Sequence, residues 1–313
     1  MKNFLQSFQK KGFVYGDPIL NKDELNKLRN SLDIEFSNNN NYSGVGLEIH
    51  QFENKTLAKK IIEILLSKEI NAVIKEFEKK FSEPLSILPS IEVHKNYHNN
   101  LYETLGWHRD CGGEMNYDYC NTKLRDEKYF FSKIGIYLQA NTEYGGCIDI
   151  IKNSHKNFSQ FKIIFRKIKS FPLKLVKIFH KYFTKIYIKI SEKFFMKLIN
   201  AKRLTPKESS PVFFDSRLIH RGTPVSRNLI SNVVFTKNNQ IKLEKNYTKY
   251  VIYSHFGNSF SLDSYFYDRL KRKNNSDEIT AWLKQVDIIK KIDRNFAEKI
   301  ELVLNPIKKK YQK

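Results

Sequence analysis

The 313-residue sequence has no long hydrophobic run and little cysteine. Its longest unbroken apolar stretch is the four residues 250–253, whereas a membrane-spanning helix needs about 20 residues, so we expect no transmembrane helix. The three cysteines, Cys111, Cys120 and Cys147, form no Cys-x-x-Cys motif, and the N-terminus has no apolar core followed by a small-residue cleavage site. These absences predict a cytoplasmic protein in a reducing environment.

Acidic residues are also few, because 33 Asp and Glu face 55 Lys and Arg, which gives a net charge of +22. Hydrophobic residues make up 41% of the chain, too many for a disordered, collagen-like or low-complexity protein. A bias towards Lys, Asn and Ile, typical of an AT-rich genome, explains part of the positive charge. Its distribution is uneven, since residues 157–203 alone carry a net charge of +12. This segment would attract an anionic partner such as a phosphate, a CoA thioester, a nucleic acid or an acidic membrane surface.

The periodicity of apolar residues divides the chain into helical and strand-like segments. Helical patterns cover residues 21–32, 55–81, 158–199 and the tail from 276. Short apolar runs bounded by Gly, Asn or Pro predict strands of an antiparallel sheet at residues 12–15, 91–94, 133–139, 147–151, 212–214 and 231–236. The pattern repeats nowhere within the chain.

His108 and Asp110 are two residues apart, so on an extended segment both side chains lie on one face. Completed by a distant second histidine, such a pair forms the facial triad that holds non-haem Fe(II) and leaves positions open for co-substrate and oxygen. The spacing alone arises easily by chance. The surrounding motifs therefore decide how it is interpreted.

Four motifs follow one another along the chain. They are Trp-His-x-Asp at Trp107–Asp110, a strand ending in Leu-Gln at Gly135–Gln139, a Gly-Gly turn leading to Asn153–Lys156, and Phe-Asp-x-Arg-x-x-His-x-Gly-x-Pro at Phe214–Pro224. In this order they resemble the phytanoyl-CoA dioxygenase family of Fe(II)/2-oxoglutarate-dependent oxygenases. The segment from Gly12 to Leu32 also resembles the family's entry segment, so the resemblance covers most of the chain.

The resemblance implies a mainly β protein with flanking helices, folded as a double-stranded β-helix, which is a jelly-roll, cupin-like architecture. Residues 1–313 would form one oxygenase domain, in which residues 157–203 are a basic helical insertion and residues 276–313 a C-terminal helical tail.

The resemblance also assigns the iron ligands and the chemistry. His108, Asp110 and His220 would bind Fe(II) as the catalytic residues, and 2-oxoglutarate would be the co-substrate. The enzyme would be an oxidoreductase that hydroxylates a C–H bond of a small molecule or lipid-like substrate, with succinate and CO2 as co-products. Related halogenating enzymes lack the carboxylate ligand, so the presence of Asp110 indicates hydroxylation.

The distal carboxylate of 2-oxoglutarate needs a cation, and the forked guanidinium of arginine meets that need best. Arg227, seven residues after His220, is the expected anchor. Arg221 is the alternative, although on a strand its side chain points away from the face of His220. Gln139 and Thr223 are further candidates for contact with the co-substrate.

The basic segment, residues 158–203, lies between two expected barrel strands and would emerge near the mouth of the cleft. We expect it to form a helical lid or docking surface that recruits an anionic substrate or rests peripherally on an acidic membrane. Alternatively, its apolar residues pack on the barrel and its lysines are merely solvated. A different function, a degenerate barrel that binds membrane or nucleic acid through this segment, is disfavoured by the complete triad. An oxygenase acting on nucleic acid is not expected, because the arginine pattern of such repair enzymes is absent.

Overall fold

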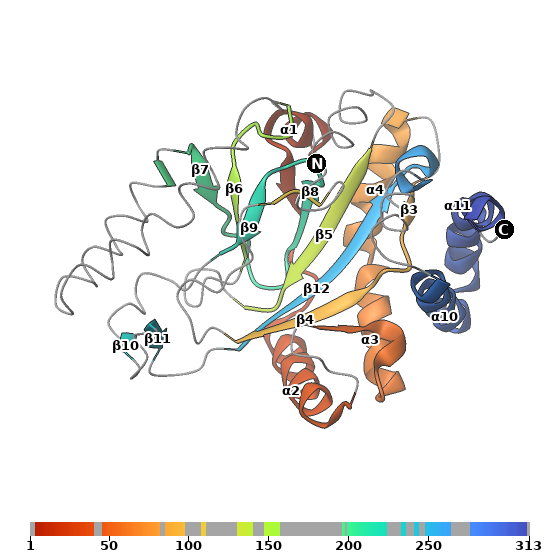
Figure 1. Ribbon diagram of the computed structural model, residues 1–313, viewed down its shortest axis with the longest axis horizontal. Helices are drawn as coiled ribbons and strands as arrows, with labels where there is room; N and C mark the ends of the chain where they lie inside the picture. Colours follow the sequence, from red (N-terminus) through yellow and green to blue (C-terminus); the bar gives the residue numbers. More distant parts are fainter. Residues whose placement is uncertain are drawn as a thin grey trace.

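The computed structural model (Figure 1) describes residues 4–40, 46–81, 85–97, 108–110, 130–139, 147–156, 196–197, 199–223, 233–235, 241–243, 248–263 and 276–311. Its helices are α1 (Phe4–Lys11), α2 (Lys22–Asn38), the 3-10 turn η1 (Ile49–Gln51), α3 (Lys55–Leu65), α4 (Lys68–Phe81), α10 (Ser276–Ile292) and α11 (Arg294–Tyr311). Its strands are β1 (Phe13–Tyr15), β2 (Gly46–Glu48), β3 (Ser86–Ile87), β4 (Glu92–Tyr97), β5 (Phe131–Tyr137), β6 (Ile148–Ile151), β7 (Ala201–Arg203), β8 (Pro211–Asp215), β9 (His220–Gly222), β10 (Val233–Phe235), β11 (Ile241–Leu243) and β12 (Thr248–Gly257).

The strands that frame the interior form two antiparallel sheets. The major sheet has the order β1-β8-β5-β12-β4-β2, with β3 also paired to β12, and the minor sheet has the order β7-β6-β9. Strands far apart in the sequence are neighbours in both sheets (Figure 1). This arrangement is the double-stranded β-helix that the sequence predicts.

Alternate residues of the central strands point to opposite sides of the major sheet. On the outer side, Ile134 and Ile252 belong to a large apolar cluster shared with helices α2, α3, α4 and α10. On the inner side, Tyr137 and Val251 belong to a second cluster with strand β6 of the minor sheet. The inner side therefore faces the interior between the two sheets.

Helix α2 begins where the sequence predicts a helix, and Asn21 is its N-cap. The side-chain Oδ1 of Asn21 accepts hydrogen bonds from the backbone N–H groups of Asp23 and Glu24, and the Glu24 carboxylate accepts one from the backbone N–H of Asn21. This reciprocal capping satisfies N–H groups that have no partner within the helix. The buried face of α2, which includes Leu25, Leu28 and Leu32, then packs on the outer side of the major sheet.

Residues 55–81, expected as one helix, form two, because α3 ends at Leu65 and α4 begins at Lys68. At the break, the hydroxyl of Ser67 accepts a hydrogen bond from the backbone N–H of Ile70 (3.5 Å), and the Asn71 side chain donates one to the carbonyl of Leu66 (2.7 Å). Such local side-chain bonds compete with continuation of a helix. The C-terminal tail is likewise two helices, and Asp293 caps the second by accepting a hydrogen bond from the backbone N–H of Phe296.

Most of the basic segment, namely residues 158–195 and residue 198, lies outside the described residues. The last three residues of the segment, Ala201–Arg203, form strand β7, which pairs with β6. The end of the segment thus belongs to the minor sheet.

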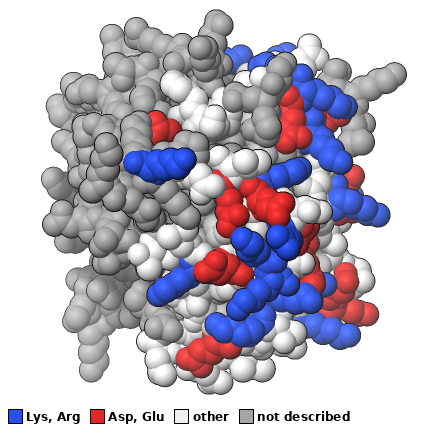
Figure 2. All heavy atoms as spheres, turned by 90° about the vertical axis from the view of Figure 1, so that its right-hand side faces the viewer, with Lys and Arg blue, Asp and Glu red and all other residues white. Residues whose placement is uncertain are grey.

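The face that carries α10 and α11 has interspersed charges of both signs (Figure 2). Two of its ion pairs are Lys290 with Glu301 (3.3 Å) and Arg294 with Glu298 (3.1 Å). Within the described part of this face, acids thus lie among the basic residues.

None of the described helices is both long and apolar enough to cross a membrane.

Candidate metal centre

His108 and His220 are joined by backbone hydrogen bonds although they are far apart in the sequence. The N–H of each residue donates to the carbonyl of the other, both at 2.9 Å, which makes an antiparallel bridge at the edge of strand β9. The backbone N–H of Asp110 donates to the carbonyl of Ser216 (3.0 Å). These bonds place the three predicted ligands together, with one donor atom of each within 4.8 Å of the others.

The turn that follows strand β6 supports this arrangement. Asn153 adopts a left-handed conformation (φ 61°), which asparagine tolerates better than most residues. The hydroxyl of the next residue, Ser154, accepts a hydrogen bond from the backbone N–H of Ile219, and its carbonyl accepts one from the guanidinium of the buried Arg109, at 2.8 and 2.9 Å. The turn therefore holds the segments that carry both histidines.

His220 is oriented by its own strand. Its Nδ1 lies 2.9 Å from the carbonyl of Leu218, so the Nδ1–H donates there and the lone pair falls on Nε2, 3.5 Å from Asp110 Oδ2. Burial lowers the pKa of His220 to about 3, although the negative charge of Asp110 opposes this shift. The imidazole is therefore neutral at physiological pH, as a metal ligand must be.

Asp110 contacts a cation as well as the two histidines. The ammonium Nζ of Lys133, on the inner side of strand β5, lies 3.1 Å from Asp110 Oδ2, and His108 Nε2 lies 3.6 Å from Oδ1. Burial opposes ionisation of Asp110, but the positive charge of Lys133 holds its pKa well below its usual range. Burial likewise opposes the charge of Lys133, but Asp110 holds its pKa above the usual value. Both side chains are therefore charged.

The donor set fits a divalent transition metal such as Fe(II). It offers two imidazole nitrogens and one carboxylate, the composition of the facial triad that leaves coordination positions open. The cluster lies where the bridge of His108 and His220 meets the interior between the two sheets. Among the described residues, His108, Asp110 and His220 are the group whose ligand atoms lie close enough together to hold a metal ion.

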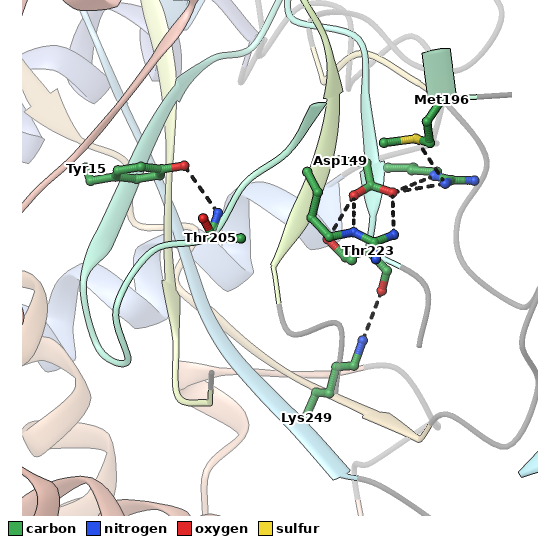
Figure 3. A network of polar contacts seen from close by, with 8 residues as sticks. Tyr15, Asp149, Met196, Thr205, Thr223 and Lys249 are labelled. Atoms are coloured by element: carbon green, nitrogen blue, oxygen red, sulfur yellow. Dashed lines mark hydrogen bonds and ion pairs between the residues drawn. The ribbon is translucent and has the colours of Figure 1, made fainter. Parts of the chain in front are cut away.

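Of the residues predicted to bind the co-substrate, two are described. The side-chain oxygen of Gln139 accepts hydrogen bonds from the backbone N–H of Tyr250 (2.8 Å) and from Arg29 (3.5 Å), so it ties strand β12 to helix α2. The backbone carbonyl of Thr223 accepts a hydrogen bond from the Lys249 ammonium at 3.0 Å (Figure 3). Arg227, the expected anchor, lies outside the described residues, as does Trp107.

The alternative anchor, Arg221, forms an ion pair with the buried carboxylate of Asp149, which is labelled in Figure 3. Its Nε and terminal nitrogen lie 3.2 and 3.0 Å from Asp149 Oδ2, while Arg203 Nε lies 2.9 Å from Asp149 Oδ1. The hydroxyl of Thr223 also donates to Asp149 Oδ1 (3.4 Å). Asp149 thus connects strands β6, β7 and β9.

Sequence reasoning missed two lysines in the interior, Lys133 and Lys249. Lys133 pairs in register with His255 and Lys249 lies two residues before Val251, so both share the inner side of the sheet with Tyr137. Burial and the positive charge of Arg203 lower the pKa of Lys249 well below its usual value. The only signal in the sequence is a lysine within an otherwise apolar strand.

No protein-family model matches the chain, and no curated protein sequence matches it significantly. Its fold is similar to solved structures of HygX from Streptomyces hygroscopicus. The structure with nickel and 2-oxoglutarate bound has a TM-score of 0.50 and a sequence identity of 11%. The structure with nickel, 2-oxoglutarate and hygromycin B bound has a TM-score of 0.50 and a sequence identity of 10%. Both similarities cover 83% of this chain and 88% of HygX. EctD from S. alaskensis, with 2-oxoglutarate and 5-hydroxyectoine, has a TM-score of 0.48 and 10% identity over 83% of this chain and 77% of EctD. The fold class is thus that of a double-stranded β-helix protein.

Proposed function

We propose that the protein is an Fe(II)/2-oxoglutarate-dependent dioxygenase that hydroxylates a C–H bond of a small molecule. The observation that carries this proposal is the cluster of His108, Asp110 and His220 inside a double-stranded β-helix. The fold alone hosts many functions, but this donor set in this position is suited to iron. Among the Fe(II)/2-oxoglutarate-dependent oxygenases, the four ordered sequence motifs favour the phytanoyl-CoA dioxygenase family.

When bound, Fe(II) with 2-oxoglutarate and oxygen would supply the oxidising power, giving succinate and CO2 as co-products. The residues of the chain orient the ligand atoms, keep the carboxylate ionised and exclude water. The Nδ1–H of His220 donates to the carbonyl of Leu218, which directs Nε2 to the metal. Asp110 remains ionised and offers a hard oxygen ligand. The inner apolar cluster around Tyr137 and Phe214 excludes water from the chemistry.

For the co-substrate, Lys249 is a further candidate anchor beside Arg227. Lys249 lies on the inner side of strand β12, and its ammonium reaches the carbonyl of Thr223, three residues beyond the ligand His220. A carboxylate brought next to this buried ammonium would favour its charged form, which burial disfavours. Arg221 is the weaker candidate, since Asp149 already holds its guanidinium.

The substrate class follows from charge and from the structural neighbours. HygX was solved with hygromycin B bound, which supports a small-molecule substrate. The net charge of +22, concentrated in residues 157–203, favours an anionic substrate. We place the enzyme in the cytoplasm, where a reducing environment keeps iron as Fe(II).

Succinate release tests the proposal. Protein loaded anaerobically with Fe(II) is mixed with 2-oxoglutarate, oxygen is admitted, and wild type is compared with His108→Ala and Asp110→Ala. We expect iron-dependent succinate from the wild type alone, because oxygenases of this class turn over slowly without their primary substrate. Absence of both succinate and Fe(II) binding in the wild type would contradict the proposal.

The second candidate function is membrane binding through the basic segment, which the net charge of +12 in residues 157–203 favours. Replacing lysines 174, 177, 181, 185, 189 and 193 by glutamine removes six of these charges. If the segment docks on an acidic membrane, co-sedimentation with phosphatidylserine vesicles falls in the variant while succinate release persists. Equal sedimentation of both proteins would exclude the membrane role.

A further inference from the structure

Lys133 reaches across the interior from the major sheet to the metal-ligand cluster. It comes from strand β5, whereas His220 comes from strand β9 of the minor sheet, and the Lys133 ammonium lies 3.1 Å from Asp110 Oδ2. The same ammonium lies 4.4 Å from the centre of the Tyr253 ring, which is a cation–π distance. The side chain is 16% exposed, so its charge is only weakly screened by solvent.

Among the described residues, Asp110 is the carboxylate that contacts Lys133. Glu92 also lies on the inner side, paired in register with Tyr253, but its carboxylate is 2.8 Å from His94 Nε2. His255 pairs in register with Lys133 and adds no fixed negative charge. Lys133 and Asp110 therefore form a pair of opposite charges that cancel within the metal-ligand cluster.

We propose that Lys133 turns the metal centre into an anion-selective site. The inference rests on metal binding by His108, Asp110 and His220. In a facial triad without such a lysine, the carboxylate removes one of the two positive charges of the metal. Here Lys133 balances the charge of Asp110, so a divalent metal held by His108, Asp110 and His220 would keep both of its positive charges with respect to this pair. Ligands entering the open positions are then selected for negative charge, and an anionic co-substrate or substrate group fits this selection.

Lys133 acts in this proposal through its charge and not only by holding Asp110 in place. A structural role requires a hydrogen-bond donor for Asp110 Oδ2, which a neutral glutamine supplies. A role through charge requires a cation, which arginine supplies and which methionine and glutamine lack. The variants Lys133→Met, Lys133→Gln and Lys133→Arg thus separate the two roles.

Co(II) binding under anaerobic conditions, followed by visible absorption, provides a readout independent of turnover. Azide is then titrated into the Co(II)-loaded proteins as an anionic probe and imidazole as a neutral one. We expect azide to bind about tenfold more weakly to Lys133→Met and Lys133→Gln, the order of effect of one charge a few ångströms away. Imidazole affinity stays unchanged, and Lys133→Arg keeps the wild-type affinity for azide.

A matched control is Lys95→Met, which removes a buried lysine from the outer side of the same sheet, where Lys95 lies 3.8 Å from Asp33. This variant keeps wild-type affinities for Co(II), azide and imidazole. Unchanged azide affinity in Lys133→Gln, or loss of azide affinity in Lys133→Arg, overturns the proposal. Failure of the wild type to take up Co(II) overturns the metal centre itself, and this inference with it.

Discussion

The three proposed metal ligands come from two short segments that lie far apart in the sequence. Their prediction depends on the ordered motifs around them, because the two-residue separation of His108 and Asp110 alone arises easily by chance. The structure brings their donor atoms within 4.8 Å. Lys133 and Lys249 could not be predicted in the same way, because the side of a sheet that a lysine faces depends on strand register, which neither composition nor local spacing reveals.

The co-substrate anchor can be identified from kinetics. In Lys249→Met we expect KM for 2-oxoglutarate to rise at least about tenfold, since a hydrogen bond to a charged group contributes about 1.5–3 kcal/mol. Lys249→Arg retains most of the affinity, and Fe(II) binding is unchanged. The measurement is succinate release against 2-oxoglutarate concentration. A rise in Arg227→Met without any in Lys249→Met would assign the anchor to Arg227.

Acid destabilises the metal-free protein through His220. Its pKa is about 3 when folded, against about 6.5 in an unfolded chain. The unfolded state thus binds more protons between these values, and the free energy of unfolding falls as pH decreases from about 6.5 towards 3, by up to about 1.4 kcal/mol per pH unit for one proton. Urea unfolding across this range measures the slope. His220→Gln is expected to have the smaller slope, and an equal slope would contradict burial of a neutral imidazole.

Among the elements, the sequence predicts strands β5, β6 and β8 but not β12, the long strand at the centre of the major sheet. Apolar runs in the sequence marked the positions of β5, β6 and β8, because buried strands carry apolar residues on both sides. The division between α3 and α4 was missed, because the period of apolar residues continues across Ser67 while the hydrogen bonds of Ser67 and Asn71 end one helix and begin the next.

The minor sheet depends on one buried carboxylate. Asp149 is fully buried and holds Arg203 and Arg221 from the two neighbouring strands. In Asp149→Asn these two guanidinium groups lose their anionic partner, and removing one member of a buried ion pair costs about 3–5 kcal/mol. We expect a loss near the lower value, because Arg203 is 25% exposed, measured as the change in unfolding free energy in urea.

The control for this prediction is the exposed ion pair of Arg294 and Glu298 on helix α11. Exposed ion pairs contribute about 0–1 kcal/mol, so Glu298→Gln changes stability little. A similar small effect in Asp149→Asn would show that the minor sheet does not depend on this carboxylate.

At the scale of the whole molecule, the proposed metal site joins segments that only the complete fold brings together. Mn(II), which replaces Fe(II) without oxidation, would bind the folded state and hardly the unfolded one. At 100 times its dissociation constant, a ligand adds about 2.7 kcal/mol of stability. We therefore expect Mn(II) with 2-oxoglutarate to raise the melting temperature by several degrees, which differential scanning fluorimetry measures. His108→Ala abolishes the increase, and an equal increase in this variant would place metal binding elsewhere.

Strand β1 pairs with strand β8 in the register Phe13↔Phe214, and β12, which follows later in the chain, occupies the centre of the same sheet. During translation, β1 leaves the ribosome long before its partner β8 has been synthesised. Pairings between such distant segments make folding slow and leave apolar strands exposed while it proceeds. The nascent chain therefore cannot complete its major sheet until residue 257 has emerged, and until then β5 lacks β12, one of its two neighbours in the sheet.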